Sequence, residues 1–117
     1  MKRSEIMHLL GAKTICGEDA PDGEIYNACG SDMMSDVLAF TKHDAILLTG
    51  LINNHVIRTA EMLDVQYIMF VRGKVPPEDV VEMAQELGMV LMTTDLPMFT
   101  ACGILYSNGI KGGMRGE

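Results

Sequence analysis

The sequence has no tryptophan, few aromatic residues and few cysteines, and these shortages exclude several classes of protein. Only 5% of its 117 residues are aromatic, while 11 are methionines, most of which we expect to fill irregular gaps in the core. The three cysteines are an odd number without a CxxC pair, which argues against a disulfide-stabilised secreted protein. No apolar run reaches the roughly 18 residues of a membrane-spanning helix. We therefore expect a cytoplasmic protein with no membrane association.

Positive charge is also scarce. Nine lysines and arginines stand against 16 aspartates and glutamates, which leaves a net charge of −7. Such a chain repels phosphate backbones, so we expect no nucleic-acid binding. Apolar residues make up 48% of the chain, which is typical of a globular protein with one core. Because a domain this small leaves much apolar surface outside that core, we expect a homodimer.

Sequence motifs of catalysis are missing as well. The GxxxxGK[ST] spacing of a P-loop is absent, so we expect no kinase activity. None of His8, His43 and His55 has a partner at zinc-binding spacing, so we expect no metal site. One catalytic alternative is a small enzyme that uses Cys29 with Asp32 and His55. Thiols on strands or on buried helix faces are inert by default, so we expect no enzyme activity.

What the sequence does contain is an alternation of apolar runs, polar loops and amphipathic helices. We predict central strands over 44–49, 66–71 and 90–93, and shorter strands over 12–16 and 24–29. This alternation is typical of a parallel α/β sheet. We therefore predict a single α/β domain over 1–117, with a mainly parallel sheet of four or five strands flanked by helices. Its ends are an N-terminal helix over 1–11 and a flexible, glycine-rich tail over 110–117.

Local patterns predict where the helices begin and which sides they bury. Asn53 or Asn54 can cap the helix that follows the first central strand. The sequence Pro-Pro-Glu-Asp at 76–79 is typical of a helix start. Asp95 can cap the last helix. The residues that we predict on one buried face of that helix are Phe99, Cys102, Gly103 and Tyr106.

The loops after parallel strands gather at one edge of the sheet, where ligands bind. Gly50 lets the chain turn into a helix whose N-terminus can attract an anion. Arg72 and Lys74 are a local exception in an acidic protein. The candidate ligand-binding edge consists of Thr49, Gly50, Asn53, Asn54, Arg72, Gly73, Lys74, Thr93 and Thr94. Capped helices and solvated turns explain the same residues without a ligand.

Four segments resemble, in order and spacing, the DRTGG domain family. Residues 29–39 (CGSDMMSDVLA) look like its entry helix, and residues 48–50 (LTG) like its central strand and turn. Residues 71–78 (VRGKVPPE) resemble its next strand and helix start, and residues 88–94 (GMVLMTT) its final strand. The sequence departs from the family at 51–54, where LINN replaces the expected glycine, aspartate and arginine. The ligand role of that arginine therefore has no counterpart here.

The resemblance implies a fold like the N-terminal domain of HPr kinase and an accessory, non-catalytic role. DRTGG domains occur beside CBS domains in regulated pyrophosphatases and at the front of some phosphotransacetylases, and stand-alone versions occur near hydrogenase genes. We therefore expect a regulatory or assembly module without a cofactor. It would bind a partner protein, such as a hydrogenase-related or other metabolic enzyme, and a small anionic ligand. The alternative is a nucleotide-sensing domain that uses the same edge.

Overall fold

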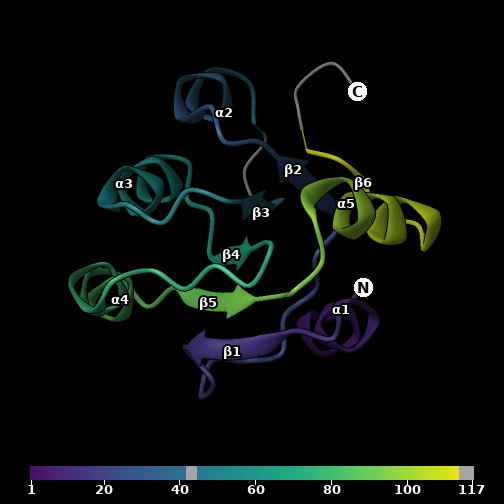
Figure 1. Cartoon of the computed structure of the whole chain (residues 1–117), viewed down its shortest axis with the longest axis horizontal. Helices are drawn as coiled ribbons and strands as arrows, with labels where there is room; N and C mark the ends of the chain where they lie inside the picture. The colour runs from purple at the N-terminus through teal and green to yellow at the C-terminus, as the bar shows by residue number, and fades with distance from the viewer. Residues whose placement is uncertain (42–44, 114–117) are drawn as a thin grey trace.

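The computed structural model describes residues 1–41 and 45–113, and it consists of one sheet between two layers of helices (Figure 1). The elements in chain order are α1 (Arg3–Leu10), β1 (Lys13–Cys16), β2 (Asn27–Gly30), α2 (Met34–Phe40), β3 (Ala45–Thr49), α3 (Asn54–Met62), β4 (Tyr67–Phe70), α4 (Glu78–Glu86), β5 (Val90–Thr93), α5 (Met98–Ser107) and β6 (Lys111–Gly112). Helices α2, α3 and α4 cover one face of the sheet, and α1 and α5 cover the other. The predicted single α/β domain is confirmed.

Over the described residues, the sheet has six strands in the order β1-β5-β4-β3-β2-β6, where four or five were predicted. Strands β2, β3, β4 and β5 are parallel to one another, as predicted, and β6 is parallel to β2. The first strand, β1, pairs antiparallel with β5, so the sheet is mixed. From β2 to β5 the chain moves one place at a time in the same direction. Helix α5 then returns the chain across the sheet to its far edge at β6.

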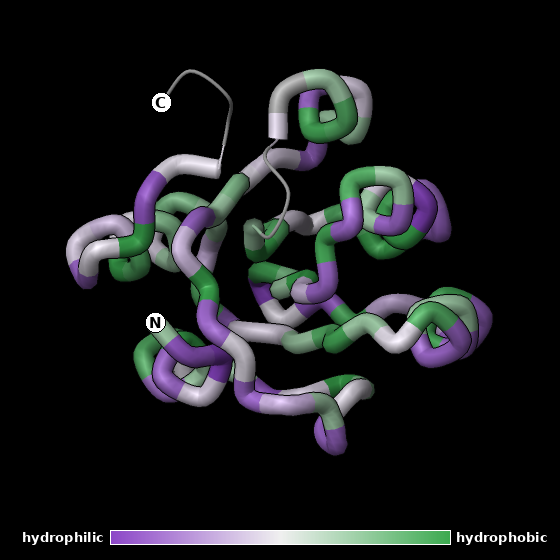
Figure 2. Tube along the Cα trace, turned by 180° about the vertical axis from the view of Figure 1, so that it is seen from behind, coloured by the Kyte–Doolittle hydropathy of each residue, from purple (hydrophilic) through white to green (hydrophobic). Residues whose placement is uncertain are grey.

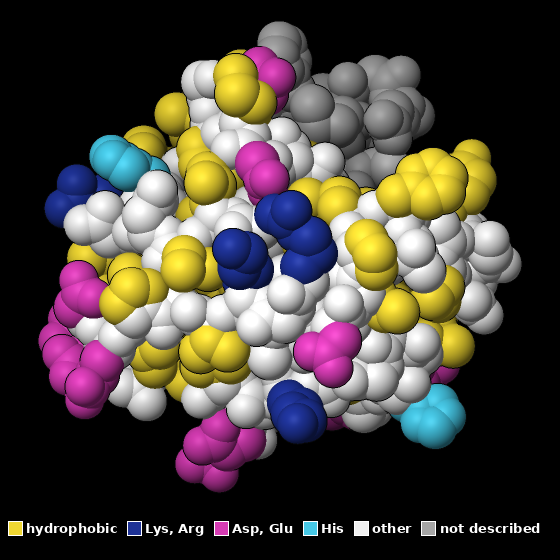
Figure 3. All heavy atoms as spheres, viewed as in Figure 1, with side chains coloured by type: hydrophobic (Ala, Val, Ile, Leu, Met, Phe, Trp, Pro, Cys, Tyr) yellow, Lys and Arg dark blue, Asp and Glu magenta, His cyan; other side chains and the backbone are white. Residues whose placement is uncertain are grey.

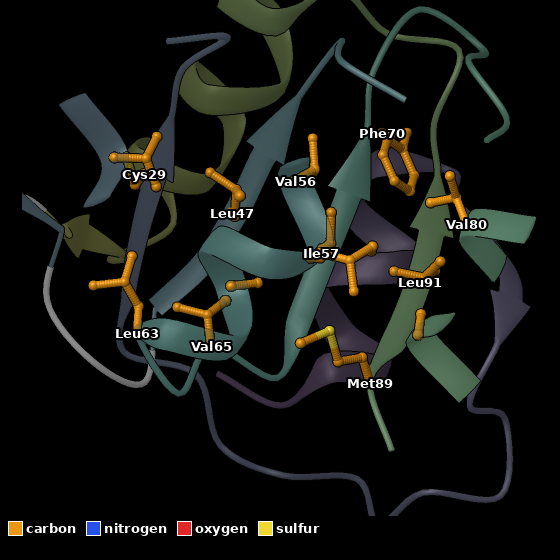
Figure 4. Packing of buried hydrophobic residues seen from close by; sticks show 14 of the residues in the cluster. Cys29, Leu47, Val56, Ile57, Leu63, Val65, Phe70, Val80, Met89 and Leu91 are labelled. Carbon is orange, nitrogen blue, oxygen red and sulfur yellow. The ribbon is translucent and has the colours of Figure 1, made fainter. Parts of the chain in front are cut away.

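The central strands form because their side chains are apolar on both faces. All five residues of β3 are buried, which is typical of parallel strands covered by helices on both sides. Successive side chains point to opposite faces. Leu47 and Phe70 belong to the core under α2, α3 and α4, whereas Leu48 and Met69 belong to the core under α1 and α5. Figure 4 shows Leu47 and Phe70 on either side of Val56 from α3.

The amphipathic helices α3 and α4 begin where the sequence predicts. The backbone N–H of His55 donates to Asn53 Oδ1 at 3.1 Å, so Asn53 caps α3. Helix α4 begins directly after Pro77. The hydrophilic stretches of α3 and α4 lie on the outside of the molecule in Figure 2, and their hydrophobic stretches face inward. In the part of the chain that the structure describes, no helix is long and apolar enough to cross a membrane.

The predicted buried face of α5 is wrong. Ala101 and Leu105 are fully buried, whereas Phe99 is 90% exposed and Tyr106 is 75% exposed. The helix is apolar all round, so its hydrophobic pattern does not distinguish one face from another. Asp95 does not cap α5 either, since the helix begins after Pro97 and has no side-chain cap.

The glycine-rich tail is structured in its first part, where flexibility was predicted from residue 110. Ile110 is 4% exposed, and the backbone N–H of Lys111 donates to the carbonyl of Tyr26 at 3.0 Å. The tail can pair because Gly113 has no side chain, and a Cβ there would lie 2.8 Å from the carbonyl oxygen of Ala28. The rest of the predicted tail, residues 114–117, and the start of the first central strand at Asp44 lie outside the described residues.

We predict that Leu105→Ala lowers the free energy of unfolding by about 2–5 kcal/mol, because it leaves a cavity between α5 and the sheet. The matched control is Leu87→Ala, since Leu87 at the end of α4 is 37% exposed and its loss should cost about 1 kcal/mol or less. Urea unfolding followed by circular dichroism measures both. Equal losses would contradict the burial of this face of α5.

Candidate functional site

The turns after β2, β3, β4 and β5 meet at one edge of the sheet, because these strands are parallel and in register. The predicted segments 49–50, 72–74 and 93–94 all lie at this edge. Figure 3 shows Lys and Arg side chains gathered near the middle of this view, where the turn between β4 and α4 lies in Figure 1. Hydrophobic side chains gather on the side of α5. The edge therefore places positive charge beside apolar surface.

Asp32, in the loop between β2 and α2, holds the turn after β3 in place. Its Oδ1 accepts a hydrogen bond from Thr49 Oγ1 at 3.0 Å and another from the backbone N–H of Gly50 at 2.7 Å. Thr49 is fully buried, and its hydroxyl also accepts from the N–H of Leu51 at 3.2 Å. The predicted ligand residue Thr49 therefore serves the fold. The carboxylate of Asp32 is itself exposed, so it presents a negative charge to solvent beside this turn.

Arg72 lies in the turn after β4, which the backbone ties to the loop before α5. Its φ of 57° is unusual for a residue with a side chain. The N–H of Arg72 donates to the carbonyl of Leu96 at 2.9 Å, and that of Gly73 donates to the carbonyl of Thr94 at 2.8 Å. The guanidinium lies against Gly50, where a Cβ would be 2.7 Å from Arg72 Nη2 and 3.5 Å from the oxygens of Asp32. Gly50 thus makes room for both charged groups.

The two threonines at the end of β5, Thr93 and Thr94, have their hydroxyls engaged within the fold. Thr93 Oγ1 donates to the carbonyl of Lys74 at 2.8 Å. Thr94 is buried, and its Oγ1 donates to the carbonyl of Leu10 at 2.6 Å. The side chain of Asn53 is likewise engaged as the cap of α3. These predicted site residues position the turns, so their side chains need no ligand to explain them.

A hollow of about 460 Å³ opens at this edge, between the β2–α2 loop and the start of α5. It is lined by Gly30, Ser31, Asp32, Val71, Arg72, Pro97, Met98 and Phe99. Of the nine predicted site residues, Arg72 lines it. Thr49, Gly50, Asn53, Asn54, Gly73, Lys74, Thr93 and Thr94 do not.

Sequence reasoning missed the rest of the lining for identifiable reasons. Ser31 and Asp32 follow β2 and so belong to the same edge by the rule that predicted the other turns. Phe99 is predicted on the buried face of α5, whereas the structure exposes it. Gly30 ends β2 beside α5, and a Cβ there would lie 2.6 Å from Cys102 Sγ, so glycine allows α5 to approach β2 closely.

The lining combines a cation, a carboxylate and exposed apolar surface. Arg72 supplies a guanidinium, which binds anions through several N–H groups in one plane. Asp32 supplies a carboxylate that accepts hydroxyl donors. Phe99 supplies an exposed ring on which a flat group can stack. Together they suit a small anionic molecule that has hydroxyls and a flat apolar part.

The alternative of a cysteine-dependent enzyme finds no support in the described geometry. Cys29 is 3% exposed in the core under α2, and Thr41 Oγ1 lies 3.3 Å from its sulfur. His55 is exposed on α3, on the outside of the same layer. Burial raises the pKa of the Cys16 thiol, and burial followed by the charge of Cys29 raises the pKa of Cys102. Within residues 1–41 and 45–113, no group of His, Cys, Asp and Glu side chains is arranged to hold a metal ion.

No protein-family model and no curated protein matches this sequence. Among solved structures, the fold is similar to the CBS and DRTGG domains of the regulatory region of Clostridium perfringens pyrophosphatase, crystallised with the activator diadenosine tetraphosphate. The TM-score is 0.68 and the identity is 19%, over 96% of this chain and 46% of that chain. This chain therefore spans about half the length of that crystallised regulatory region. The similarity establishes the α/β fold. The similar structure includes a DRTGG domain, which is the type of domain that the sequence resembles.

We predict that Asp32→Ala lowers the free energy of unfolding by about 1–3 kcal/mol, because the buried Thr49 hydroxyl and the Gly50 N–H lose their acceptor. Asp36→Ala is the matched control, since this exposed carboxylate in the first turn of α2 contributes only about 0.3–1 kcal/mol through the helix dipole. Urea unfolding measures both variants. A loss at Asp32 no larger than that at Asp36 would contradict its structural role.

Proposed function

We propose that this protein is a non-catalytic regulatory module that binds a small anionic ligand of the nucleotide class. The observation that carries the proposal is one hollow of about 460 Å³ that brings together Arg72, Asp32 and the exposed ring of Phe99. Ligand pockets in proteins are typically about 300–1,000 Å³, so the hollow is large enough for part or all of a nucleotide.

The anionic part of the ligand is assigned to Arg72 and the start of α5. The first residues of α5 line the hollow. Among the residues that the structure describes, no side chain caps this helix, so its N-terminal N–H groups are open to a ligand. A helix N-terminus has roughly half a positive charge, which adds to that of the guanidinium. In a chain with a net charge of −7, the guanidinium and the helix end thus supply local positive charge.

The neutral parts of a nucleotide match the other two groups. Both hydrogen bonds to Asp32 go to Oδ1, so among the described residues Oδ2 remains an acceptor for a ribose hydroxyl. A base can stack on Phe99, and stacking on an aromatic side chain contributes about 1–3 kcal/mol per base. The carboxylate of Asp32 repels a simple phosphate ion, which therefore suits the hollow less well than a nucleotide does.

The regulatory role rests on the fold and on the absence of a catalytic constellation in the described residues. The similar structure is a regulatory region crystallised with a nucleotide activator, which supports nucleotides as the first ligands to test. A module of this kind acts on another protein, and we propose a metabolic enzyme, such as a hydrogenase-related one, as that partner.

We predict that ATP, ADP or diadenosine tetraphosphate raises the unfolding temperature of the wild-type protein, because a ligand bound to the folded state stabilises it by about 2.7 kcal/mol at a hundred times its Kd. Arg72→Gln should abolish the shift. Arg58→Gln should preserve it, because Arg58 is exposed on α3 and lies outside the hollow.

Differential scanning fluorimetry measures the unfolding temperature of each variant with each nucleotide, and inorganic phosphate serves as a further probe. If no nucleotide shifts the wild-type protein, the nucleotide class is wrong. If both arginine variants respond as the wild type does, the ligand does not bind at Arg72.

We also predict that iodoacetamide labels all three cysteines of the folded protein far more slowly at neutral pH than it labels them in urea. The thiolate is the reactive form, and the raised pKa values of Cys16 and Cys102 make it scarcer than usual at neutral pH. Cys29 is protected by burial. Mass spectrometry of timed samples measures the rates, and rapid labelling of any one cysteine would favour the enzyme alternative.

A further inference from the structure

The outer face of α5 presents two aromatic side chains to solvent. Phe99 and Tyr106 are seven residues apart, which places them two turns apart on the same face of the helix. They are 90% and 75% exposed. Tyr26, whose carbonyl accepts from Lys111 of β6, is 60% exposed on the segment before β2. Exposed aromatic side chains are enriched where proteins bind one another.

Two recesses lie beside these aromatic side chains. One of about 130 Å³ is lined by Cys102 and Tyr106 of α5 and by residues of β2 and β6. Another of about 180 Å³ is lined by Tyr26 and the segment 108–111. Projections and recesses therefore occur together around α5. A twofold interface needs this combination, because the same surface of each copy must fit itself.

The distribution of charge favours one arrangement of such an interface. A net charge of −7 opposes association of two copies, but α5 contains no charged residue. Exposed Asp95 precedes the helix, and exposed Lys111 follows it. If two α5 helices pack antiparallel, Asp95 of each copy lies near Lys111 of the partner subunit. The helix dipoles are then also opposed, which is favourable.

We propose that a second copy of this chain covers α5, with the two α5 helices antiparallel about a twofold axis. Aromatic side chains bury about 150–250 Å² each when fully covered, and part of that area is already buried within the fold. At their exposed fractions, Phe99, Tyr106 and Tyr26 therefore supply about half of the roughly 800 Å² per partner of a standard interface. The uncharged helix forms the centre of the interface, and Asp95 and Lys111 form its rim. This homodimer does not require a ligand in the hollow.

The first test compares the oligomeric state of two variants by analytical ultracentrifugation. We expect the wild-type protein to sediment at twice its chain mass of 12.8 kDa at micromolar concentration. Tyr106→Ser should raise the Kd of the dimer by at least about tenfold. Met62→Ser is the matched control and should leave the Kd unchanged, because Met62 is 64% exposed on α3, in the helical layer across the sheet. Circular dichroism verifies that both variants fold.

The second test exchanges the charges at the rim of the proposed interface. Asp95→Lys and Lys111→Asp should each weaken the dimer, because each places like charges opposite one another. The double variant should restore it, since Asp95 and Lys111 lie at opposite ends of α5 within one copy and meet only across the twofold axis. A monomeric wild-type protein, or a dimer that Tyr106→Ser leaves unchanged, would overturn the proposal. A dimer that the single charge variants weaken and the double variant does not restore would overturn the antiparallel arrangement.

Discussion

The architecture depends on one constraint, which is that the strands β2 to β5 are parallel and must be buried on both faces. Parallel strands need crossover connections, and here α2, α3 and α4 supply them. Because the chain moves through these strands in one direction and crossovers are right-handed, all three helices lie on the same face. The other face stays covered only because α1 and α5 pack on it. The meeting of four turns at one edge follows from the same constraint.

The parts of the fold that sequence predicts are those in which local pattern and tertiary packing agree. The apolar runs of β3 and β4 are too short for helices and have no polar face, so they fit only buried strands. In helix α5 the local pattern does not indicate the packing, because the helix is apolar all round. Its buried side is decided by contacts with α1 and β2. Strand β6 also has no local signal, since its two residues pair only because β2 offers a free edge and Gly113 permits the approach.

The candidate site also has one part that the sequence predicts and another that it does not. Topology alone places Gly50 and Arg72 at the edge, so a sequence that predicts parallel strands also predicts their neighbourhood. Their roles depend on contacts between distant segments, which no local pattern reveals. The hydroxyl of Thr94 is engaged by Leu10, 84 residues away, and Thr49 is engaged by Asp32, 17 residues away. The sequence can therefore place a threonine at the end of a strand at this edge of the sheet. Whether its hydroxyl is available to a ligand follows only from the packed structure.

Phe99 belongs to both proposed surfaces, because it lines the hollow beside Arg72 and projects from the face of α5. A nucleotide base that stacks on this ring restricts its position, and a second copy packed against α5 restricts it too. If ligand binding and self-association each select one position of Phe99, then each must change the affinity of the other by the same factor. The sign depends on whether the two positions agree. The proposed regulatory role needs such a link between an occupied site and a surface that another protein can detect. Phe99 is the residue that the two proposed surfaces share, so the link would run through it.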